Sequence, residues 1–438
     1  MGEIFFTHFF YSKGIVERRS TSYNPIQFNS LRAGMNHNPR IIQISSRQQA
    51  ADSLHRIGVE AYGIESMSPK MLNVNVLLEG IESKVANILK QEMLSIGGDV
   101  AVARGTVDCS LERTDAIVIG TRKQIERFLK KLAHQPFGIS KLAQEIGMCL
   151  DRYDRKGNVL KTSRREILIS KPLIMGILNI TPDSFSDGGA YADADAAVDR
   201  AIEMEAEGAD IIDIGAESTR PGSEGIPLDV ELERLVPVLK KINQTVKIPV
   251  SIDTTKAEIA RVAADYGMEI INDISAMTAD DRMPEIAEQT GMAVVLMHMR
   301  GTPKTMQSGS LAYHSLMGEI IGFLRERVEY AEKRGIDPDK IIIDPGIGFS
   351  KSIEDNLRIL NHLREFRVIG KALLVGPSRK GFIGKLTGED KPADRIIGTA
   401  VTVALAAKNG ANIIRVHDVK QMKQAVDMAC AVAGGSFT

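Results

Sequence analysis

From residue 172 onward, short apolar runs alternate regularly with longer amphipathic stretches. The runs are rich in β-branched residues and almost continuously apolar, which is typical of strands covered on both faces. Glycines stand where the intervening helices should end, at Gly208, Gly267, Gly291, Gly335 and Gly410. The predicted strands are Leu173–Ile180, Asp210–Gly215, Pro249–Asp253, Glu269–Ile274, Ala293–His298, Ile341–Pro345, Ala372–Gly376 and Ile413–His417.

Eight strand–helix units within about 260 residues predict an α/β fold of the (β/α)8 barrel type. A doubly wound parallel sheet is the alternative architecture. That alternative requires a glycine-rich dinucleotide-binding turn after the first strand, and the sequence has none there.

The first 160 residues lack this regularity. They combine predicted strands at Val74–Leu78, Val100–Ala103 and Ala116–Ile119 with predicted helices at Lys84–Leu94 and Arg122–His134. A chain of 438 residues is long enough for two domains. The charged segment Asp151–Thr162, with its Gly-Asn pair, indicates a linker or a surface hairpin. We therefore expect an accessory α/β domain of unknown role over residues 1–160 and a barrel domain over residues 170–438.

Composition excludes several classes of protein. The formal net charge of −1 provides no global basic field for nucleic acid. The apolar runs are shorter than the roughly 20 residues that a membrane helix needs, and no basic region precedes Ile4–Phe10 as in a signal peptide. Cys109, Cys149 and Cys430 are far apart and form no C-x-x-C motif. We expect a cytoplasmic protein that binds neither nucleic acid nor membrane.

Every predicted strand ends in a polar group. In chain order these are Asn179, Asp213, Asp253, Asn272, His298, Asp344, Ser378–Lys380 and Arg415–His417. A single such residue could cap a helix or pair between strands, but a buried polar group without a partner costs roughly several kcal/mol. Active sites of barrels lie at this end of the strands. Eight polar ends in succession therefore favour a functional site.

The mixture of residue types indicates the ligand. Asp253, Asn272 and Asp344 supply acceptors for a flat heterocycle that presents an N–H beside an exocyclic amine. Lys380, Arg415 and His417 form a cationic cluster on the last two strands, the sector in which many barrels bind phosphate. The pattern predicts a heterocycle on one side of the site and an anion on the other.

Two long segments, Met175–Gly189 (MGILNITPDSFSDGG) and Ile212–Gly222 (IDIGAESTRPG), resemble the first two signatures of the dihydropteroate synthases. Shorter segments are similar to the remaining blocks of that family, in the same order, and the resemblance covers roughly residues 170–432. They are SIDT (251–254), INDIS (271–275), LMHMRGTPKTMQ (296–307), DPGIGF (344–349), GPSRKGFIG (376–384) and IIRVHDV (413–419). Pro377 and Gly381 depart from the family pattern.

The resemblance implies a transferase of folate biosynthesis, which condenses 6-hydroxymethyl-7,8-dihydropterin pyrophosphate with para-aminobenzoate to give 7,8-dihydropteroate and pyrophosphate. It also implies a Mg²⁺ cofactor, a homodimer and a target of sulfonamides. The catalytic residues implied are Asn179, Asp253, Asp344, Lys380, Arg415 and His417.

The family's other roles are implied residue by residue. Pterin would be bound by Asp253, Asn272, Asp344 and Lys380, lined by Met299, Phe349 and Gly376, with Asp213 at the base. Asn179 would be the ligand of Mg²⁺, and Thr219, Arg415 and His417 would hold pyrophosphate. The para-aminobenzoate site would use Ser378 and two closing loops, Thr181–Tyr191 and Ser218–Pro227, which carry Phe185, Asp187, Arg220 and Pro221.

Two other functions are compatible with a pterin-binding barrel. One is a methyltransferase domain that handles methyltetrahydrofolate, which would have no need for a pyrophosphate cluster. The other is a non-catalytic pterin-binding protein, although Asn179, Thr219, Lys380 and Arg415 argue for retained activity.

Overall fold

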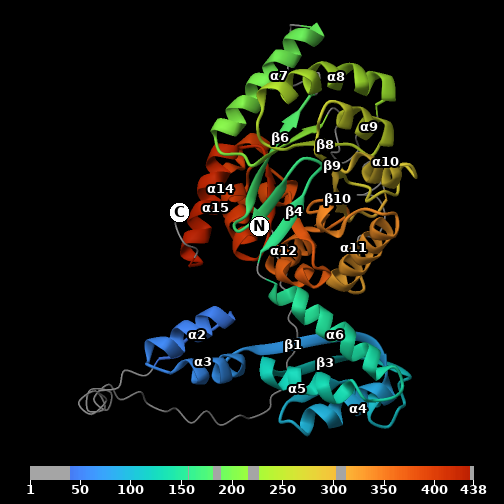
Figure 1. Cartoon of the computed structure of the whole chain (residues 1–438), viewed down its shortest axis with the longest axis vertical. Helices are drawn as coiled ribbons and strands as arrows, with labels where there is room; N and C mark the ends of the chain where they lie inside the picture. The colour runs from blue at the N-terminus through green and yellow to red at the C-terminus, as the bar shows by residue number, and fades with distance from the viewer. Residues whose placement is uncertain (1–39, 156, 181–188, 216–225, 302–311, 435–438) are drawn as a thin grey trace, which may run out of the picture. The chain divides into compact units, whose positions relative to one another are not determined.

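The computed structural model describes residues 40–155, 157–180, 189–215, 226–301 and 312–434. The chain divides into two compact units, residues 1–132 and 133–438 (Figure 1). This division lies before the boundary that we expected near residue 160. Helix α6 (Ile139–Asp154) packs on the short helix η5 (Leu363–Ile369) of the barrel, and Arg367 donates to the backbone oxygen of Arg155. Residues 133–160 therefore group with the barrel.

The first unit is built on an antiparallel sheet with strand order β1-β3-β2. Its core comes from Val76, Leu89, Val100, Val118 and Phe128, which are buried where helices cover one face of the sheet. This arrangement confirms the expected α/β character of the N-terminal region. The elements in order are α2 (Arg47–Arg56), α3 (Ala61–Met67), η1 (Ser68–Lys70), β1 (Asn73–Glu82), α4 (Ser83–Leu94), β2 (Asp99–Val102), η2 (Arg104–Thr106), β3 (Arg113–Thr121) and α5 (Arg122–Leu132).

The second unit is a closed parallel barrel with strand order β10-β11-β12-β13-β6-β7-β8-β9, and all eight predicted strands are confirmed. The first and last strands close it, since Leu173 of β6 is in register with Ile413 of β13. The strands are β6 (Leu173–Asn179), β7 (Ile211–Gly215), β8 (Val250–Asp253), β9 (Ile270–Asp273), β10 (Ala293–Met297), β11 (Ile341–Asp344), β12 (Ala372–Val375) and β13 (Ile413–Val416).

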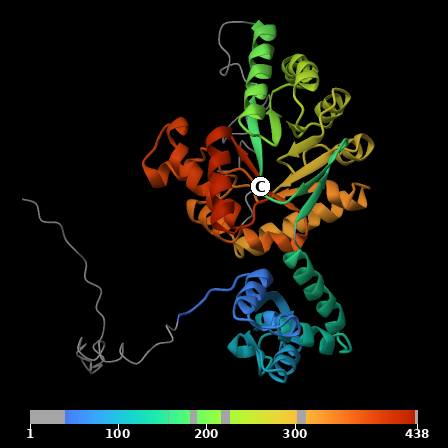
Figure 2. The ribbon, with the colours of Figure 1, turned by 60° about the vertical axis from the view of Figure 1, so that its left-hand side comes forward.

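Helices surround these strands, as Figures 1 and 2 show from two directions. They are α7 (Gly189–Ala206), α8 (Leu228–Thr245), α9 (Ala257–Asp265), α10 (Met283–Thr290), α11 (Leu316–Lys333), α12 (Ile353–Asn361), α13 (Gly381–Thr387), α14 (Ile396–Lys408) and α15 (Val419–Val432). The predicted helix-ending glycines all have positive φ. Gly267 has φ of +83°, a backbone conformation that residues with a Cβ rarely adopt, so glycine is favoured there.

A hairpin of β4 (Asn158–Lys161) and β5 (Glu166–Ile169) closes the amino-terminal end of the barrel. Its first strand lies within Asp151–Thr162, where we expected a linker or hairpin, and its second strand lies beyond that segment. Leu160 and Ile169 pack against inward-facing residues of the barrel strands, such as Met175 and Ile211. We call this hairpin the floor of the barrel. Arg165 fixes it to the barrel through an ion pair of 2.6 Å with the buried Glu269. In the part of the chain that the structure describes, no helix has the length and apolarity to cross a membrane.

Candidate active site

A buried ion-pair network lies inside the barrel, at the opposite end from the floor. Arg415 of β13 donates from Nε to Oδ2 of Asp213 over 2.6 Å and from Nη2 to Oδ2 of Asp253 over 2.8 Å. Asn272 donates from Nδ2 to the same oxygen of Asp213 over 2.9 Å. Four of the predicted site residues, from β7, β8, β9 and β13, are thus joined directly.

The register of the barrel strands explains why these four side chains are in contact. Residues in register on neighbouring parallel strands point to the same face, and Asp253 is in register with Asn272. Asp213 is in register with Ser251, two residues before Asp253. Asp213 and Asp253 therefore lie at successive levels inside the barrel. The side chain of Arg415 is long enough to reach both.

The network changes the acidity of its members. Burial raises the pKa of Asp253 above its usual range, and the positive charge of Arg415 opposes that rise. Burial alone would lower the pKa of Arg415, but Asp213 and Asp253 raise it. The guanidinium is thus a permanent cation whose orientation is set by two carboxylates.

A second group lies at the ends of β11 and β12. Oδ1 of Asp344 accepts a hydrogen bond of 2.7 Å from the backbone nitrogen of Gly346, and burial raises the pKa of this carboxyl to about 6. The ammonium of Lys380 lies 4.0 Å from the centre of the Phe349 ring. Burial, with the charge of Arg415, lowers the pKa of Lys380 to about 8. An acceptor, a donor and an aromatic face are therefore near one another, which suits a flat polar ring.

Sequence reasoning missed Lys351, which lies behind this group. Its side chain is buried and donates from Nζ to the backbone oxygens of Phe349 over 2.9 Å and His298 over 3.3 Å. Nζ also lies 3.1 Å from Nδ1 of His298. Burial lowers the pKa of Lys351 to about 7 and, with the charge of Lys351, that of His298 to about 3. The only signal in the sequence is a lysine directly after the glycine-rich DPGIGFS segment.

The loop after β12 joins the end of β13 through Ser378. Its Oγ lies 3.0 Å from Nδ1 of His417 and accepts from the backbone nitrogen of His417. The next residue, Arg379, has a left-handed backbone with φ of 59° and donates from Nε to Asp418. A non-glycine residue in this conformation is costly and is retained where surrounding contacts hold it. These contacts fix the direction of Ser378 and His417.

The remaining predicted site residues are less completely described. Asn179 is half-buried at the end of β6, in register with Gly215. Met299 and Gly376 follow β10 and β12 and are half-buried. The residues that lie outside the described ranges are Phe185, Asp187, Thr219, Arg220 and Pro221.

Metal binding can be judged from the donors. Among the described residues, no group of three or more His, Cys, Asp or Glu side chains could hold a metal ion. Asn179 offers an amide oxygen at the open end of the barrel, a ligand that suits Mg²⁺ when substrate phosphates and water complete its shell. The residues present are therefore compatible with a magnesium ion that arrives with a phosphate-bearing substrate.

Comparison with known proteins identifies the barrel. Residues 175–417 match the family described as "Pterin binding enzyme". The chain is 46% identical to the dihydropteroate synthase of Synechocystis over 259 residues, which are 59% of this chain and 89% of that protein. The solved structure of Xanthomonas albilineans dihydropteroate synthase with 4-aminobenzoic acid is similar with a TM-score of 0.60 and 39% identity. It covers 64% of this chain and is itself covered completely.

A longer match includes the N-terminal region. A probable bifunctional folylpolyglutamate synthase/dihydropteroate synthase of Halobacterium salinarum is 36% identical over 393 residues, which are 90% of this chain. The chain covers only 47% of that protein.

Proposed function

Because the chain belongs to the dihydropteroate synthase family of pterin-binding enzymes, we propose that the polar residues at the carboxyl end of its barrel perform that family's reaction. The enzyme is a transferase of folate biosynthesis. It condenses 6-hydroxymethyl-7,8-dihydropterin pyrophosphate with para-aminobenzoate, and the products are 7,8-dihydropteroate and pyrophosphate. The observation that supports the residue assignment is the Arg415–Asp213–Asp253 network, which lies beside Asp344 and Lys380.

The pterin ring would be held by groups of complementary hydrogen-bonding character. Asp344 accepts from the ring N–H and the exocyclic amine, and Lys380 donates to the ring acceptors. Asp253 and Asn272 bind the opposite edge, while Phe349 covers one face together with Met299 and Gly376. The position of Lys380 over Phe349 supports this assignment, because a ring placed there would meet both the donor and the aromatic face. Asp213 would act below the ring, by orienting Arg415 and Asn272.

The pyrophosphate would be met by Arg415, His417 and Thr219. Guanidinium has five N–H donors, and its ion pairs with Asp213 and Asp253 engage Nε and Nη2. Among the described residues Nη1 makes no hydrogen bond, so it can meet an anion. Asn179 would bind Mg²⁺, which supplies positive charge to neutralise the leaving pyrophosphate when it is bound.

In the reaction, the bond between the pterin's methylene carbon and the pyrophosphate oxygen breaks. The nitrogen of para-aminobenzoate forms the new bond to that carbon and releases one proton to water. An aromatic amine is neutral near pH 7, so its attack depends on formation of the pterin-stabilised cation and on exclusion of water. Ser378 and the loops with Phe185, Asp187, Arg220 and Pro221 would hold this second substrate. We therefore propose that para-aminobenzoate binds after pterin and pyrophosphate.

A homodimer is supported by an apolar stripe on α14. Ile397, Val401 and Leu405 are exposed and four residues apart, so they lie on one face of the helix. Met428 and Val432 of the neighbouring α15 are also exposed. Such a surface fits a second copy of the chain. Sedimentation should detect a dimer that Val401→Glu dissociates.

The cytoplasmic location that we propose is supported by the cysteines, since Cys109, Cys149 and Cys430 are all free thiols. For the N-terminal unit we propose only an accessory role.

Pyrophosphate release from the pterin substrate, measured with and without para-aminobenzoate, tests the residue assignment. Wild-type enzyme should release pyrophosphate with formation of dihydropteroate, and Asp344→Asn and Arg415→Ala should each reduce the rate at least about tenfold. A control variant with an exposed lysine changed, Lys333→Ala, should behave as wild type. Unchanged rates in both site variants would contradict the assignment.

A further inference from the structure

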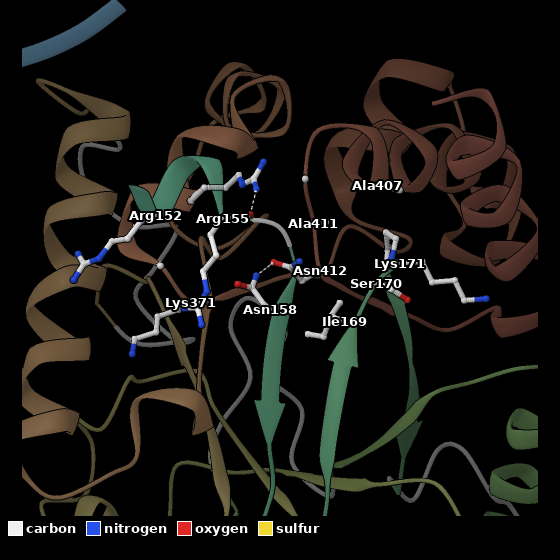
Figure 3. Close-up of a pocket in the computed structure, with 15 residues that line it drawn as sticks. Arg152, Arg155, Asn158, Ile169, Ser170, Lys171, Lys371, Ala407, Ala411 and Asn412 are labelled. Atoms are coloured by element: carbon white, nitrogen blue, oxygen red, sulfur yellow. Dashed lines mark hydrogen bonds between the residues drawn. The ribbon is translucent and has the colours of Figure 1, made fainter. Parts of the chain in front are cut away.

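A second pocket of about 210 Å³ lies at the other end of the barrel, where the strands begin (Figure 3). Lys171, Lys371 and Asn412 line it, and they come shortly before strands β6, β12 and β13. The end of α6 and the floor hairpin complete its wall through Arg155 and Asn158. The pocket is therefore separated from the candidate active site by the length of the barrel strands.

The lining of the pocket is strongly cationic. Five basic residues contribute to it, and none of the described residues that line it is acidic: the basic residues are Arg152, Arg155, Lys171, Arg367 and Lys371. Lys371 is neutralised by an ion pair of 2.6 Å with Glu332, outside the pocket. Within the described ranges, the other four form no ion pair.

Neutral groups hold Arg152 and Arg367 in place. Arg367 donates from Nη2 to the backbone oxygen of Arg155 over 2.6 Å. The side chain of Arg152 lies across Gly370, where an added Cβ would be 3.0 Å from its Cγ. Asn158 donates to Asn412 over 3.0 Å at the centre of the pocket. Because backbone oxygens accept from Arg367 and Arg152, these two guanidinium groups are held without a carboxylate, and their positive charges remain available to a ligand.

A solvated basic surface is the simplest alternative for such a cluster. Two features argue against it. The charges line a concavity, where like charges focus a positive potential, and Lys371 shows that this fold supplies a carboxylate where a lysine is only structural. Figure 3 also shows Arg152, Arg155 and Lys371 on one side of the Asn158–Asn412 pair and Lys171 on the other. A ligand must therefore present negative charge at both ends.

We propose that this pocket binds a small oligophosphate, meaning a molecule with two or more linked phosphate groups. A phosphate monoester carries roughly two negative charges, which is about half the charge of the four cations that form no ion pair within the described ranges. Linked phosphates supply more charge and can reach both sides of the pocket, and arginine binds their oxygens in a two-pronged fashion. Free pyrophosphate and the phosphate chain of a nucleotide share this chemistry.

Part of the proposed oligophosphate site is formed by residues that precede the match to pterin-binding enzymes. Arg152, Arg155 and Asn158 come before residue 175, where the match to pterin-binding enzymes begins, whereas Arg367 and Asn412 lie within it. A bound oligophosphate would connect these two parts of the second unit and favour its folded form by mass action.

Calorimetry on the full chain with inorganic pyrophosphate, without Mg²⁺, tests the proposal. The variant Arg155→Ala/Lys171→Ala removes one charge from each side of the pocket and keeps the backbone oxygen that Arg367 uses. We expect this variant to lose a binding event, or to weaken it at least about tenfold. The Michaelis constant for pterin pyrophosphate should stay unchanged, because the catalytic site is at the other end.

The control is Lys141→Ala/Lys333→Ala, which removes the same charge from exposed helix positions. It should bind pyrophosphate as wild type does. Parallel titrations with a nucleoside triphosphate distinguish the two sources of the phosphates. The ligand that binds more tightly, pyrophosphate or the nucleotide, identifies the source. Equal pyrophosphate binding by wild type and the pocket variant overturns the proposal. Citrate binding as tight as that of pyrophosphate overturns the choice of phosphate.

Discussion

Arg415 holds Asp213 through a hydrogen bond of 2.6 Å between Nε and Oδ2, and the carboxylate of Asp213 is fully buried. Removing one partner of a buried ion pair leaves an uncompensated charge. Arg415→Ala is therefore expected to lower the free energy of unfolding by roughly 3–5 kcal/mol, as measured by urea denaturation. It should also weaken pterin pyrophosphate more than a pterin that lacks phosphates.

The double variant Asp213→Asn/Arg415→Met is the control, because it removes both charges together. It should recover part of the lost stability. Equal weakening of both ligands by Arg415→Ala would assign the residue a structural role only.

Asp344 is expected to make pterin binding depend on pH. Burial raises its pKa to about 6, above the ordinary value of 3.8 that applies to the unfolded chain. The folded state therefore binds this proton more tightly, and the stability that the group contributes at low pH is lost as pH rises through 6. Pterin affinity should follow the opposite course and fall as pH drops through 6, because the ring N–H groups need the carboxylate.

Asp344→Asn separates these two effects. The amide keeps an oxygen for the backbone of Gly346 but carries no charge. At pH 8 the variant should be more stable by about 1–3 kcal/mol, given 1.36 kcal/mol per pKa unit, and should bind pterin at least about tenfold more weakly. Calorimetry at pH 5 and pH 8 measures the pterin affinity, and denaturation at the same two pH values measures the free energy of unfolding. Unchanged pterin affinity at pH 8 would rule out the contact.

Lys351 is expected to position the loop of Gly346 and Phe349. Lys351→Met removes its donation to the backbone oxygens of Phe349 and His298. The Michaelis constant for the pterin substrate should rise several-fold, with a smaller change in kcat. The folded pKa of about 7 lies below the ordinary 10.5, so stability gained through this group rises between pH 7 and pH 10.

The slope of stability against pH provides a readout beyond activity. Lys351→Met should flatten this rise, and the exposed control Lys333→Met should not. If the slope persisted in Lys351→Met, another group would be responsible for it.

The floor of the barrel limits how far the chain can be shortened from its N-terminus. Deletion of residues 1–160 would remove Leu160, which is fully buried in the barrel's end. A chain that begins at residue 133 keeps this contact and should retain catalysis and a cooperative thermal transition.

A chain that begins at residue 170 loses both Leu160 and Ile169. It should be less stable by about 3–6 kcal/mol, given roughly 1.5–3 kcal/mol for each buried aliphatic side chain. Circular dichroism during heating compares the two. Equal stability would show that the hairpin only covers the barrel.

The order of substrate binding can be tested by calorimetry. Without pterin or pyrophosphate, para-aminobenzoate should bind weakly, and Mg²⁺ with pterin and pyrophosphate should strengthen it. Pro221→Gly should raise the Michaelis constant for para-aminobenzoate and alter pterin affinity little. Tight binding of para-aminobenzoate alone would exclude the ordered scheme.

The strands could be predicted from the sequence because burial on both faces leaves a continuous apolar run, as in Ile341–Ile343. The polar ends of those runs, such as Asp213, Asp253 and Arg415, were also predictable because a barrel brings every strand end to one place. The pairing of these side chains with one another could not be predicted. Whether Arg415 meets Asp213 or an anion depends on the register between β13 and β7, which no local pattern contains.

Other features escaped prediction for a related reason. Lys351 follows a loop and has no periodic neighbours, so its burial against His298 arises only in the folded chain. Residues 139–154, which form helix α6, fell within the N-terminal domain that we expected over residues 1–160, whereas the packing of α6 on η5 joins it to the barrel. Arg327 lies in a charged helical stretch, and no local pattern indicates that it donates to the backbone oxygens of Ala276 and Met277, both of which have positive φ.

The pairing of β6 with β13 has a consequence for synthesis on the ribosome. Leu173 emerges long before its partner Ile413, so the open edge of β6 must wait while the intervening strands are translated. The strands of the sheet β1-β3-β2 all end by Thr121, so their pairing can form while the barrel is still being translated. The edge of β6 that faces β13 is open to pairing with other nascent chains. This exposure lasts until Val416 has left the exit tunnel and β13 can pair with β6.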